Sequence, residues 1–273
     1  MDTRREEWQL FYEENADCSY TGGNLHYHDQ WEIYYLKAGR CRYFIDKDTY
    51  DLRAGDMVII PAGVLHTAVY SAERHSRVLI NCGRQYIPAS VYPRLGEMTY
   101  LCRRAAWQGE IEGRLSRIAW EYTARDEFSQ DMIRSELAEL LILLARSARE
   151  GEGVLADRDF VTEAISYMQK HYAQRVTLRE VAAHCAVSYE HLSRTFKKRT
   201  GFGFNEYLTL YRLKQAEALL LGGEEIPVGE IAYRCGFSDS NYFAERFGQI
   251  YGLPPTALRR QGREAAPRKI FLP

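Results

Sequence analysis

The chain has 273 residues, which is enough for about two domains that each bury a core. Its formal net charge of −1 hides an asymmetry, because residues from 158 onward hold 17 Lys and Arg against 12 Asp and Glu, an excess that suits a polyanionic partner. The six cysteines are scattered without a CxxC pair, and no apolar run is long enough to cross a bilayer, so we expect a cytoplasmic protein without disulfides and without a membrane partner.

Residues 1–106 are predicted to form a β domain. The first 19 residues hold Trp8, Leu10 and Phe11 among acids, a pattern that fits either an edge strand or an arm folded onto the rest of the domain. From residue 20 to about 102, segments such as EIYYLKAG, CRYFID and MVIIPAG are rich in aromatic and β-branched residues and are bounded by Gly, Asp and Pro. Such short strands separated by regular turns indicate a sandwich or a barrel.

Four polar residues of this domain form a candidate site: His26, His28, Glu32 and His66. Alternate residues of a strand share a face, so His26 and His28 should point the same way and Glu32 can join them. Three imidazoles and a carboxylate suit Zn, Fe, Mn or Ni, so the set is a candidate site for a divalent transition metal. The same residues could instead hydrogen-bond inside the barrel around a metal-free pocket, and the sequence leaves both interpretations open.

The spacing of these residues resembles the two motifs of the cupin superfamily, H-x-H-x3-E-x6-G and G-x5-P-x-G-x2-H. Gly39 completes the first motif, and Gly55, Pro61 and Gly63 precede His66 in the second, which normally ends in Asn where this chain has Tyr70. The resemblance implies a cupin-type β-barrel, or jelly roll, that serves as an effector-sensing domain.

Large aromatic side chains are frequent near these histidines. Tyr and Trp offer a flat apolar face with one polar tip, which suits a sugar ring, although ordinary barrel core explains any single one of them. We therefore favour a carbohydrate or another small polar molecule as effector. The candidate effector-binding residues are His26, His28, Trp31, Glu32, Tyr34 and His66.

Residues 107–150 change to a helical pattern. Ile133, Leu137, Leu140 and Leu144 recur at spacings of four, three and four, which gives an apolar seam along one side of a helix. This seam can pack on the barrel of the same chain or against a second copy, and the segment is a candidate for homodimerisation. Residues 151–158, GEGVLADR, have no periodic pattern and are predicted to be a linker.

Residues 159–262 contain a repeated helix-turn-helix pattern. The copies are TLREVAAHCAVSYEHLSRTFKKRTG (177–201) and PVGEIAYRCGFSDSNYFAERFGQIYG (227–252). Each begins with a short helix and a tight turn, AVS or GFS, in which Ser188 and Ser238 are expected to cap the second helix. That second helix has two apolar residues four apart, which predicts one buried stripe and one free face. A plain helical bundle is the alternative, but two copies in register favour DNA binding.

The runs SYEHLSRTFKKRTGFGFNEYLTLYRLKQAEALLL, VGEIAYRCGFSDSNYFAERF and YGLPPTALRR resemble the AraC/XylS family of transcription regulators. The resemblance implies two helix-turn-helix units on a linker helix at about 205–221, whose recognition helices enter successive major-groove segments. In one departure, Phe247 is followed by Gly248 and Gln249 where the family usually has a basic residue. The implied DNA-binding residues are Glu190, Ser193, Arg194, Lys197, Lys198, Ser240, Asn241, Glu245 and Arg246.

Together these patterns predict an α+β protein of two domains, a cupin-type barrel followed by helices and an all-α domain with two helix-turn-helix units. The predicted function is a ligand-responsive, sequence-specific, DNA-binding transcription regulator of a catabolic operon. It would act as a homodimer on double-stranded promoter DNA, would contact RNA polymerase if it is an activator, would not be an enzyme and would require no cofactor. The alternatives are a constitutive DNA-binding dimer with a non-sensing cupin, and a metal-cupin enzyme tethered to DNA. Residues after 260 show no clear structure.

Overall fold

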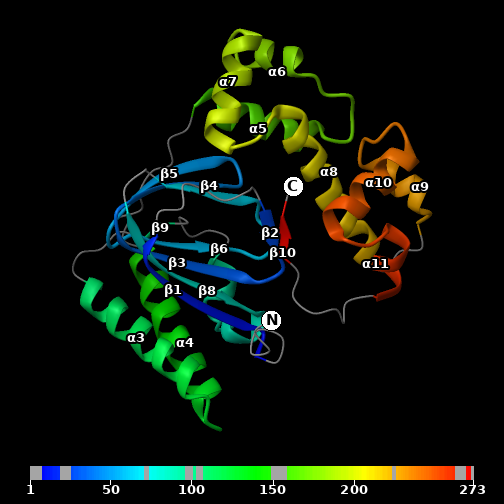
Figure 1. Ribbon diagram of the computed structural model, residues 1–273. Coiled ribbons are helices and arrows are strands. Elements are labelled where there is room, and N and C mark those ends of the chain that lie inside the picture. The colour runs from blue at the N-terminus through cyan, green and yellow to red at the C-terminus, as the bar shows by residue number, and fades with distance from the viewer. Residues whose placement is uncertain are drawn as a thin grey trace.

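The computed structural model describes residues 8–18, 26–70, 74–95, 101–102, 107–148, 159–222, 226–261 and 269–271. A β-barrel with two covering helices is followed by an all-helical domain, which confirms the predicted fold class (Figure 1). The expected linker, residues 151–158, lies outside the described residues.

Two five-stranded antiparallel sheets face one another in the barrel, in the orders β1-β8-β3-β6-β9 and β10-β2-β7-β4-β5. The N-terminal segment is an edge strand, because β1 pairs only with β8 among the described strands. The strands are β1 (Leu10–Cys18), β2 (His26–His28), β3 (Trp31–Ala38), β4 (Arg40–Ile45), β5 (Asp48–Arg53), β6 (Met57–Ile60), β7 (His66–Tyr70), β8 (His75–Cys82), β9 (Leu101–Cys102) and β10 (Lys269–Phe271). The short helices η1 (Arg84–Tyr86) and α2 (Tyr92–Leu95) follow β8.

The C-terminal strand β10 returns from the helical domain to the barrel. It pairs antiparallel with β2, so that Lys269 lies opposite His28 and Phe271 lies opposite His26. The sequence had suggested no structure here. Extended backbone at a free sheet edge finds hydrogen-bond partners that no local sequence pattern reveals.

Alternation along the strands divides the apolar residues into two cores. In β3, Tyr34 and Leu36 belong to the barrel interior, together with Tyr43 of β4. Ile33 and Tyr35 instead belong to a second core on the outer face of that sheet. The period-two alternation of strand side chains accounts for this division.

The outer face of the β1-containing sheet is covered by α3 (Gln108–Ala124) and α4 (Ser129–Ala148) (Figure 1). The predicted seam of Leu137, Leu140 and Leu144 is at most 1% exposed and packs in the same core as Ile33. Of the two alternatives, the structure shows packing on the barrel of the same chain. The seam is therefore closed to a second copy, and homodimerisation stays a prediction that requires another surface.

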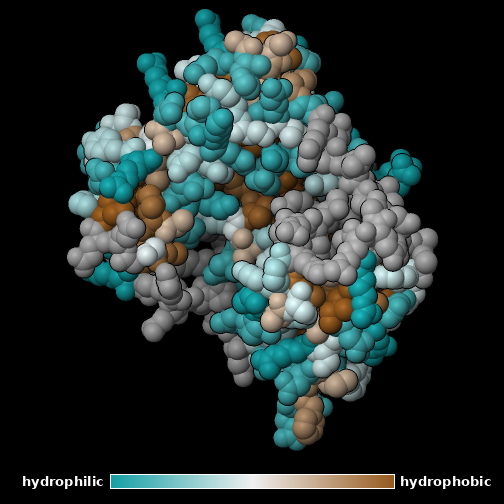
Figure 2. All heavy atoms as spheres, turned by 180° about the vertical axis from the view of Figure 1, so that it is seen from behind, coloured by the Kyte–Doolittle hydropathy of each residue, from teal (hydrophilic) through white to brown (hydrophobic). Residues whose placement is uncertain are grey.

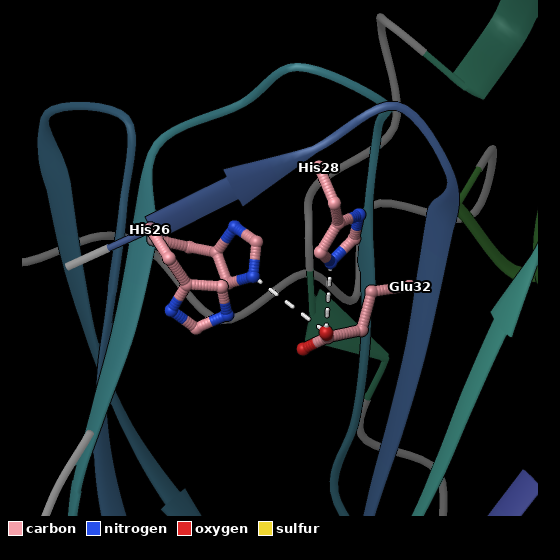
Figure 3. A group of neighbouring side chains, drawn as sticks. His26, His28 and Glu32 are labelled. Carbon is pink, nitrogen blue, oxygen red and sulfur yellow. Dashed lines mark hydrogen bonds and ion pairs between the residues drawn. The ribbon is translucent and has the colours of Figure 1, made fainter. Parts of the chain in front are cut away.

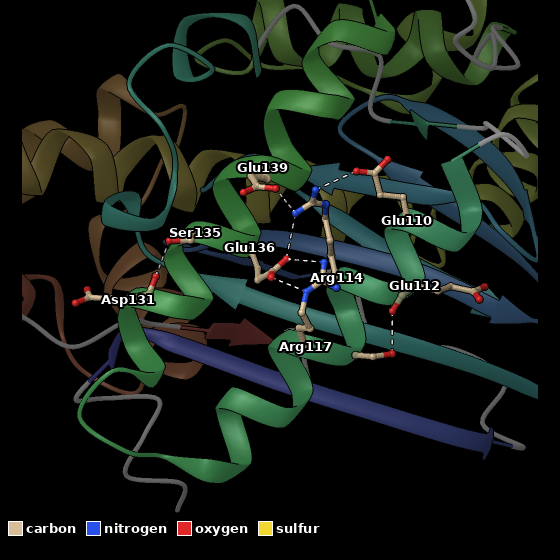
Figure 4. A network of polar contacts seen from close by, with 9 residues as sticks. Glu110, Glu112, Arg114, Arg117, Asp131, Ser135, Glu136 and Glu139 are labelled. Atoms are coloured by element: carbon tan, nitrogen blue, oxygen red, sulfur yellow. Dashed lines mark hydrogen bonds and ion pairs between the residues drawn. The ribbon is translucent and has the colours of Figure 1, made fainter.

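Ion pairs join the two covering helices on their outer side. Arg114 and Arg117 of α3 both bind the carboxylate of Glu136 in α4, with nitrogen–oxygen distances of 3.1 and 2.6 Å (Figure 4). The Arg117 side chain is 54% exposed, so its pair contributes only about 0–1 kcal/mol. Both pairs join one helix to the other and not to the sheet. Burial of the leucine seam, rather than this network, therefore holds the helices on the sheet.

The helical domain contains α5 (Phe160–His171), α6 (Leu178–His184), α7 (Tyr189–Thr200), α8 (Phe204–Leu221), α9 (Val228–Arg234), α10 (Ser240–Tyr251) and α11 (Pro255–Gln261). The long helix α8 joins the α6–α7 unit to the α9–α10 unit, as the sequence predicts (Figure 1). Seen from behind, the surface is mostly hydrophilic, with apolar side chains in separate small areas (Figure 2). Within the described residues, no helix combines the length and apolar character needed to cross a bilayer.

Gly236 makes the turn of the second helix-turn-helix unit. Its φ of 85° lies in the left-handed region, and a Cβ there would collide with the backbone oxygen of Tyr172. Gly252 also has a positive φ, 71°, but a Cβ there would meet no atom within 4 Å. Both positions therefore require a left-handed backbone conformation, but only position 236 also lacks the space for a side chain.

We expect Gly252→Ala to destabilise the helical domain by about 1–2 kcal/mol, the cost of a left-handed conformation for an L-residue. Gly236→Ala should cost about 1–3 kcal/mol more, because extra atoms are forced into a packed site. Unfolding in urea, followed by circular dichroism at 222 nm, measures the difference. Equal losses in the two variants would show that the contact with Tyr172 does not constrain the turn.

Candidate sensor site and DNA interface

The four residues of the candidate metal set meet inside the barrel. His26 and His28 come from β2, Glu32 from β3 and His66 from β7, and one potential ligand atom of each lies within 4.8 Å of the others. Figure 3 shows the imidazoles of His26 and His28 and the carboxylate of Glu32 pointing toward a common centre. His28, Glu32 and His66 are buried, and His26 is partly exposed.

Backbone carbonyls fix the tautomers of two of these histidines. His28 Nδ1 donates to the carbonyl of Gln30 at 2.7 Å, and His66 Nδ1 donates to the carbonyl of Val64 at 2.8 Å. In the neutral rings, each Nε2 therefore carries a lone pair. These Nε2 atoms lie 3.1 and 3.6 Å from Oε2 of Glu32.

Each lone pair repels the carboxylate unless a hydrogen-bond donor or a positive charge lies between them. Protonation of a histidine or a bound cation would supply that charge. Burial by itself raises the pKa of Glu32, but the neighbouring His66 and His28 together lower it well below its usual value. A histidine that donates one ring N–H to a backbone carbonyl and turns the other nitrogen inward has the usual arrangement of a metal ligand.

The dimensions of the cluster also fit a metal. Two ligand atoms that are each about 2.1 Å from a Zn²⁺ ion lie at most about 4.2 Å apart. The observed spread of 4.8 Å therefore requires only a small contraction. The residues present fit a divalent transition metal without a change of strand register.

Two residues that the sequence analysis missed complete this cluster. The Tyr43 hydroxyl donates to Glu32 Oε1 at 2.6 Å. The Asn81 amide lies 3.1 Å from Glu32 Oε2 and 3.2 Å from His28 Nε2. Asn81 belongs to β8 directly opposite Glu32, so only strand pairing brings it here. An amide is therefore present in the cluster, although Tyr70 replaces the Asn that normally ends the second motif.

The two aromatic candidates for effector binding lie on opposite sides of β3. Tyr34 shares the interior face with Glu32 and packs edge-to-face on Tyr43 at a ring distance of 5.1 Å. Trp31 instead faces the covering helices and packs against Tyr92 of α2. The structure therefore brings Tyr34, but not Trp31, to the interior face that carries the cluster.

The first recognition helix, α7, has the expected buried stripe and free face. Leu192 and Phe196 are fully buried, and Ser188 accepts a hydrogen bond from the backbone of His191 as its cap. The candidate DNA contacts of this helix are Glu190, Ser193, Arg194, Lys197 and Lys198. All of these are exposed except Ser193, which is half-buried.

The second recognition helix, α10, repeats this arrangement with one difference. Phe243 and Phe247 are buried, while Asn241 and Glu245 are exposed and Ser240 and Arg246 are half-buried. The expected cap Ser238 is wrong. Asp239 takes this place and accepts from the backbone amides of Asn241 and Tyr242. The helix therefore begins one residue later than expected. Both Ser and Asp can cap a helix, so a Ser-Asp pair in the sequence does not decide which of the two is the cap.

The barrel and the helical domain share an apolar core. Tyr27, Phe44 and Leu65 of the barrel belong to the hydrophobic core of the helical domain. The Tyr27 hydroxyl donates to Glu217 of α8 at 2.8 Å and also contacts the hydroxyl of Tyr251 at the end of α10. Tyr27 therefore connects β2, which carries His26 and His28, to both the linker helix and the second recognition helix.

A second polar contact holds the linker helix at the other end of this interface. The Tyr207 hydroxyl of α8 donates to the carbonyl of Asp46, at 3.1 Å. The Gln169 amide of α5 donates to the Asp46 carboxylate at 2.8 Å. The sensor barrel thus contacts the DNA-binding domain through its linker helix.

Comparisons with known proteins agree with this division of the chain. Residues 15–87 match the model of an AraC-like ligand binding domain, and residues 181–261 match that of a helix-turn-helix domain. The transcriptional activator RhaR of Mannheimia succiniciproducens is 25% identical over 86% of both chains. The activator RhaS of Klebsiella pneumoniae is 36% identical over 46% of this chain and 45% of its own length, so this chain spans about half of that relative.

Two solved structures show similarity of different extent. The C-terminal domain of AraT, a response regulator from Geobacillus stearothermophilus, is 37% identical, covering 40% of this chain and 89% of that chain with a TM-score of 0.37. ToxT from Vibrio cholerae is 11% identical, covering 92% of this chain and 99% of that chain with a TM-score of 0.40.

A ligand-binding barrel joined to a pair of helix-turn-helix units defines a DNA-binding transcription regulator with its own sensor domain. The N-terminal half matches a model of an AraC-like ligand binding domain, the C-terminal half matches a helix-turn-helix model, and the matched relatives are transcriptional activators. The chain belongs to the AraC family of transcription regulators.

Proposed function

We propose that this protein activates transcription of a catabolic operon when a small molecule, favoured to be a carbohydrate, binds inside its barrel. The observation that carries this proposal is the pairing of two exposed recognition helices with a buried polar cluster in the barrel of the same chain. The matched relatives named RhaR and RhaS are transcriptional activators, which supports activation here. A regulator of this kind has no need of catalysis.

The experiment that tests this function combines a footprint with a ligand screen. Two recognition helices in one protomer should protect two successive major-groove segments, about 34 Å apart. A true effector should raise the melting temperature of the full chain by mass action and should change the footprint or the DNA affinity. A footprint without any ligand response across a sugar library would favour the alternative of a constitutive DNA-binding protein.

We propose that Tyr27 links effector binding to DNA binding. Strand alternation places its neighbours His26 and His28 on the interior face of β2, so a ligand that moves β2 also moves Tyr27. Burial and the neighbouring Tyr251 and Glu217 raise the pKa of Tyr27 well above its usual value, so its hydroxyl stays a donor. A shift of β2 therefore displaces the Tyr27 hydroxyl from its partners on α8 and α10.

Tyr27→Phe should loosen this contact and speed hydrogen exchange in α8. Glu217 keeps the hydrogen bond from Tyr251 but loses the one from the barrel, and a hydrogen bond to a charged group is worth about 1.5–3 kcal/mol. Tyr12→Phe is the matched control, since the Tyr12 hydroxyl also binds a glutamate, Glu14, but lies in the other sheet. Exchange in α8 is measured by mass spectrometry. An equal effect of the control, or none in Tyr27→Phe, would show that this hydroxyl does not hold the domains together.

We propose that His26, His28, Glu32 and His66 can hold one divalent transition metal, which would act as a charged anchor for a polar effector. Protein purified without chelators is then expected to carry up to one equivalent of metal, and His66→Gln should lose it, because metal sites depend on every ligand. His75→Gln is the control, as His75 is buried in the same barrel outside the set. Elemental analysis measures the metal content of the wild type and of both variants.

A metal-free protein after supplementation with Zn, Mn, Fe and Ni would contradict a metal site. The cluster would then be a polar lining in which a protonated histidine supplies the missing positive charge. That result would also exclude the metal-cupin enzyme alternative.

We also propose a homodimer. The apolar side chains that α3, α4 and the turn between them leave exposed include Trp120, Phe128 and Met132. They offer a surface for a second copy in place of the buried leucine seam.

A further inference from the structure

A cleft lies outside the barrel, between the sensor domain and the first recognition helix. Its volume is about 520 Å³, and it lies over the outer face of β4, β5 and β7 with Lys198 of α7 on one side. Figure 1 shows α7 above the β4–β5 hairpin. Its lining includes Arg40, Arg42, Asp51, Arg53, Val69 and Lys198.

The strand register concentrates positive charge in this cleft. Arg40 of β4 lies directly opposite Arg53 of β5, and Arg42 lies opposite Asp51. Arg42 binds Asp51 at 2.8 Å, and Asp51 is the only acid among the described residues of the lining. Three arginines and Lys198 thus face one carboxylate. An anion placed between the opposed Arg40 and Arg53 is attracted by both side chains.

The cleft has the size of a small-molecule site, which is typically about 300–1,000 Å³. Guanidinium groups bind carboxylate and phosphate oxygens through paired, charge-assisted hydrogen bonds, and a lysine adds a point charge. Val69, which is 39% exposed, provides an apolar floor beside them. We propose that this cleft binds a small anion with carboxylate or phosphate oxygens, and that the anion competes with DNA for Lys198.

Competition follows from the position of Lys198. On the free face of α7, this lysine is a predicted contact for the DNA backbone, yet in this arrangement it lines the cleft with the sensor arginines. One ammonium group cannot serve both partners at once. A bound anion therefore stabilises the arrangement in which α7 rests against the sensor, and by linkage it weakens DNA binding. The proposed competition between the anion and DNA rests on the proposed function, whereas anion binding in the cleft does not.

The test of anion binding uses the full chain and inorganic phosphate, with sodium acetate as the carboxylate probe, at ionic strength held constant with sodium chloride. Calorimetry should show saturable binding of at least one probe. In Arg40→Ala/Arg53→Ala the affinity should fall at least about tenfold, because two charge-assisted contacts are lost. Arg146→Ala/Arg175→Ala is the control, since it removes two exposed arginines outside the cleft. No saturable binding of either probe, or equal weakening in the control, would overturn the site.

The test of competition measures affinity for the operator with and without the binding probe at the same ionic strength. The probe should weaken DNA binding of the wild type and of the control, but not of Arg40→Ala/Arg53→Ala, whose substitutions lie in the sensor. Anion binding without this effect would overturn the competition. Failure of the wild type to bind DNA at all would refute the proposed function and leave the calorimetric result standing.

Discussion

Leu140→Arg is expected to unfold the sensor domain rather than to yield a folded monomer. Leu140 is fully buried in the core between α4 and the sheet. Truncation of a buried leucine alone costs about 2–5 kcal/mol, and a buried unpaired guanidinium adds several kcal/mol. Domains are stable by only about 5–15 kcal/mol, so the substitution should remove most or all of the folding free energy.

Tryptophan fluorescence measures this loss, because all four tryptophans precede residue 121 and report on the sensor domain alone. Ser135→Arg is the matched control, since it introduces the same charge at an exposed position of the same helix, outside the proposed dimer surface. It should melt within about 0.5 kcal/mol of the wild type. A Leu140→Arg protein with wild-type melting and a monomeric mass would instead restore the leucine seam as a dimer contact.

Arg194→Ala combined with Asn241→Ala is expected to abolish specific DNA recognition while the protein stays folded. Both side chains are exposed, and they lie on different recognition helices. Arg194 is predicted to pair with guanine and Asn241 with adenine, each worth about 1–3 kcal/mol. Distant sites are nearly additive, so the double variant should bind its operator about 30- to 20,000-fold more weakly.

Binding to the operator and to unrelated DNA at one salt concentration measures this effect. Lys197→Ala is the control, because a phosphate contact should weaken all sequences alike and flatten the salt dependence by about one unit. If the double variant loses affinity equally on unrelated DNA, these two residues do not read bases.

The sequence predicted the repeated helix-turn-helix units because their information is local. The buried pairs Leu192 with Phe196 and Phe243 with Phe247 follow from helical spacing, and the positive φ of Gly236 follows from the turn. The metal set was predictable for a related reason. His26 and His28 alternate on one strand, and cupin spacing links them to His66. The wrong cap at Ser238 shows the limit of such reasoning, since two adjacent capping residues differ only in backbone geometry.

Other features depended on contacts between distant segments. Trp31 and Tyr34 were both predicted to bind the effector, because the interior face of a strand is undecided where both of its faces are apolar. The fold places only Tyr34 on the interior face. Asn81 reaches Glu32 only through the pairing of β3 with β8. The sequence allowed the leucine seam to pack either on the barrel of the same chain or against a second copy. In the structure it packs on the sheet of the same chain.

The amino-acid sequence by itself determined the two kinds of domain, the recognition helices and the four polar residues of the barrel, because each follows from the spacing of residues within one element or motif. Only the tertiary structure decided where Lys198 and the C-terminal strand lie, and that Tyr27 joins the sensor to the linker helix. These positions depend on which surfaces meet when the two domains pack, and no local pattern of side chains encodes that choice.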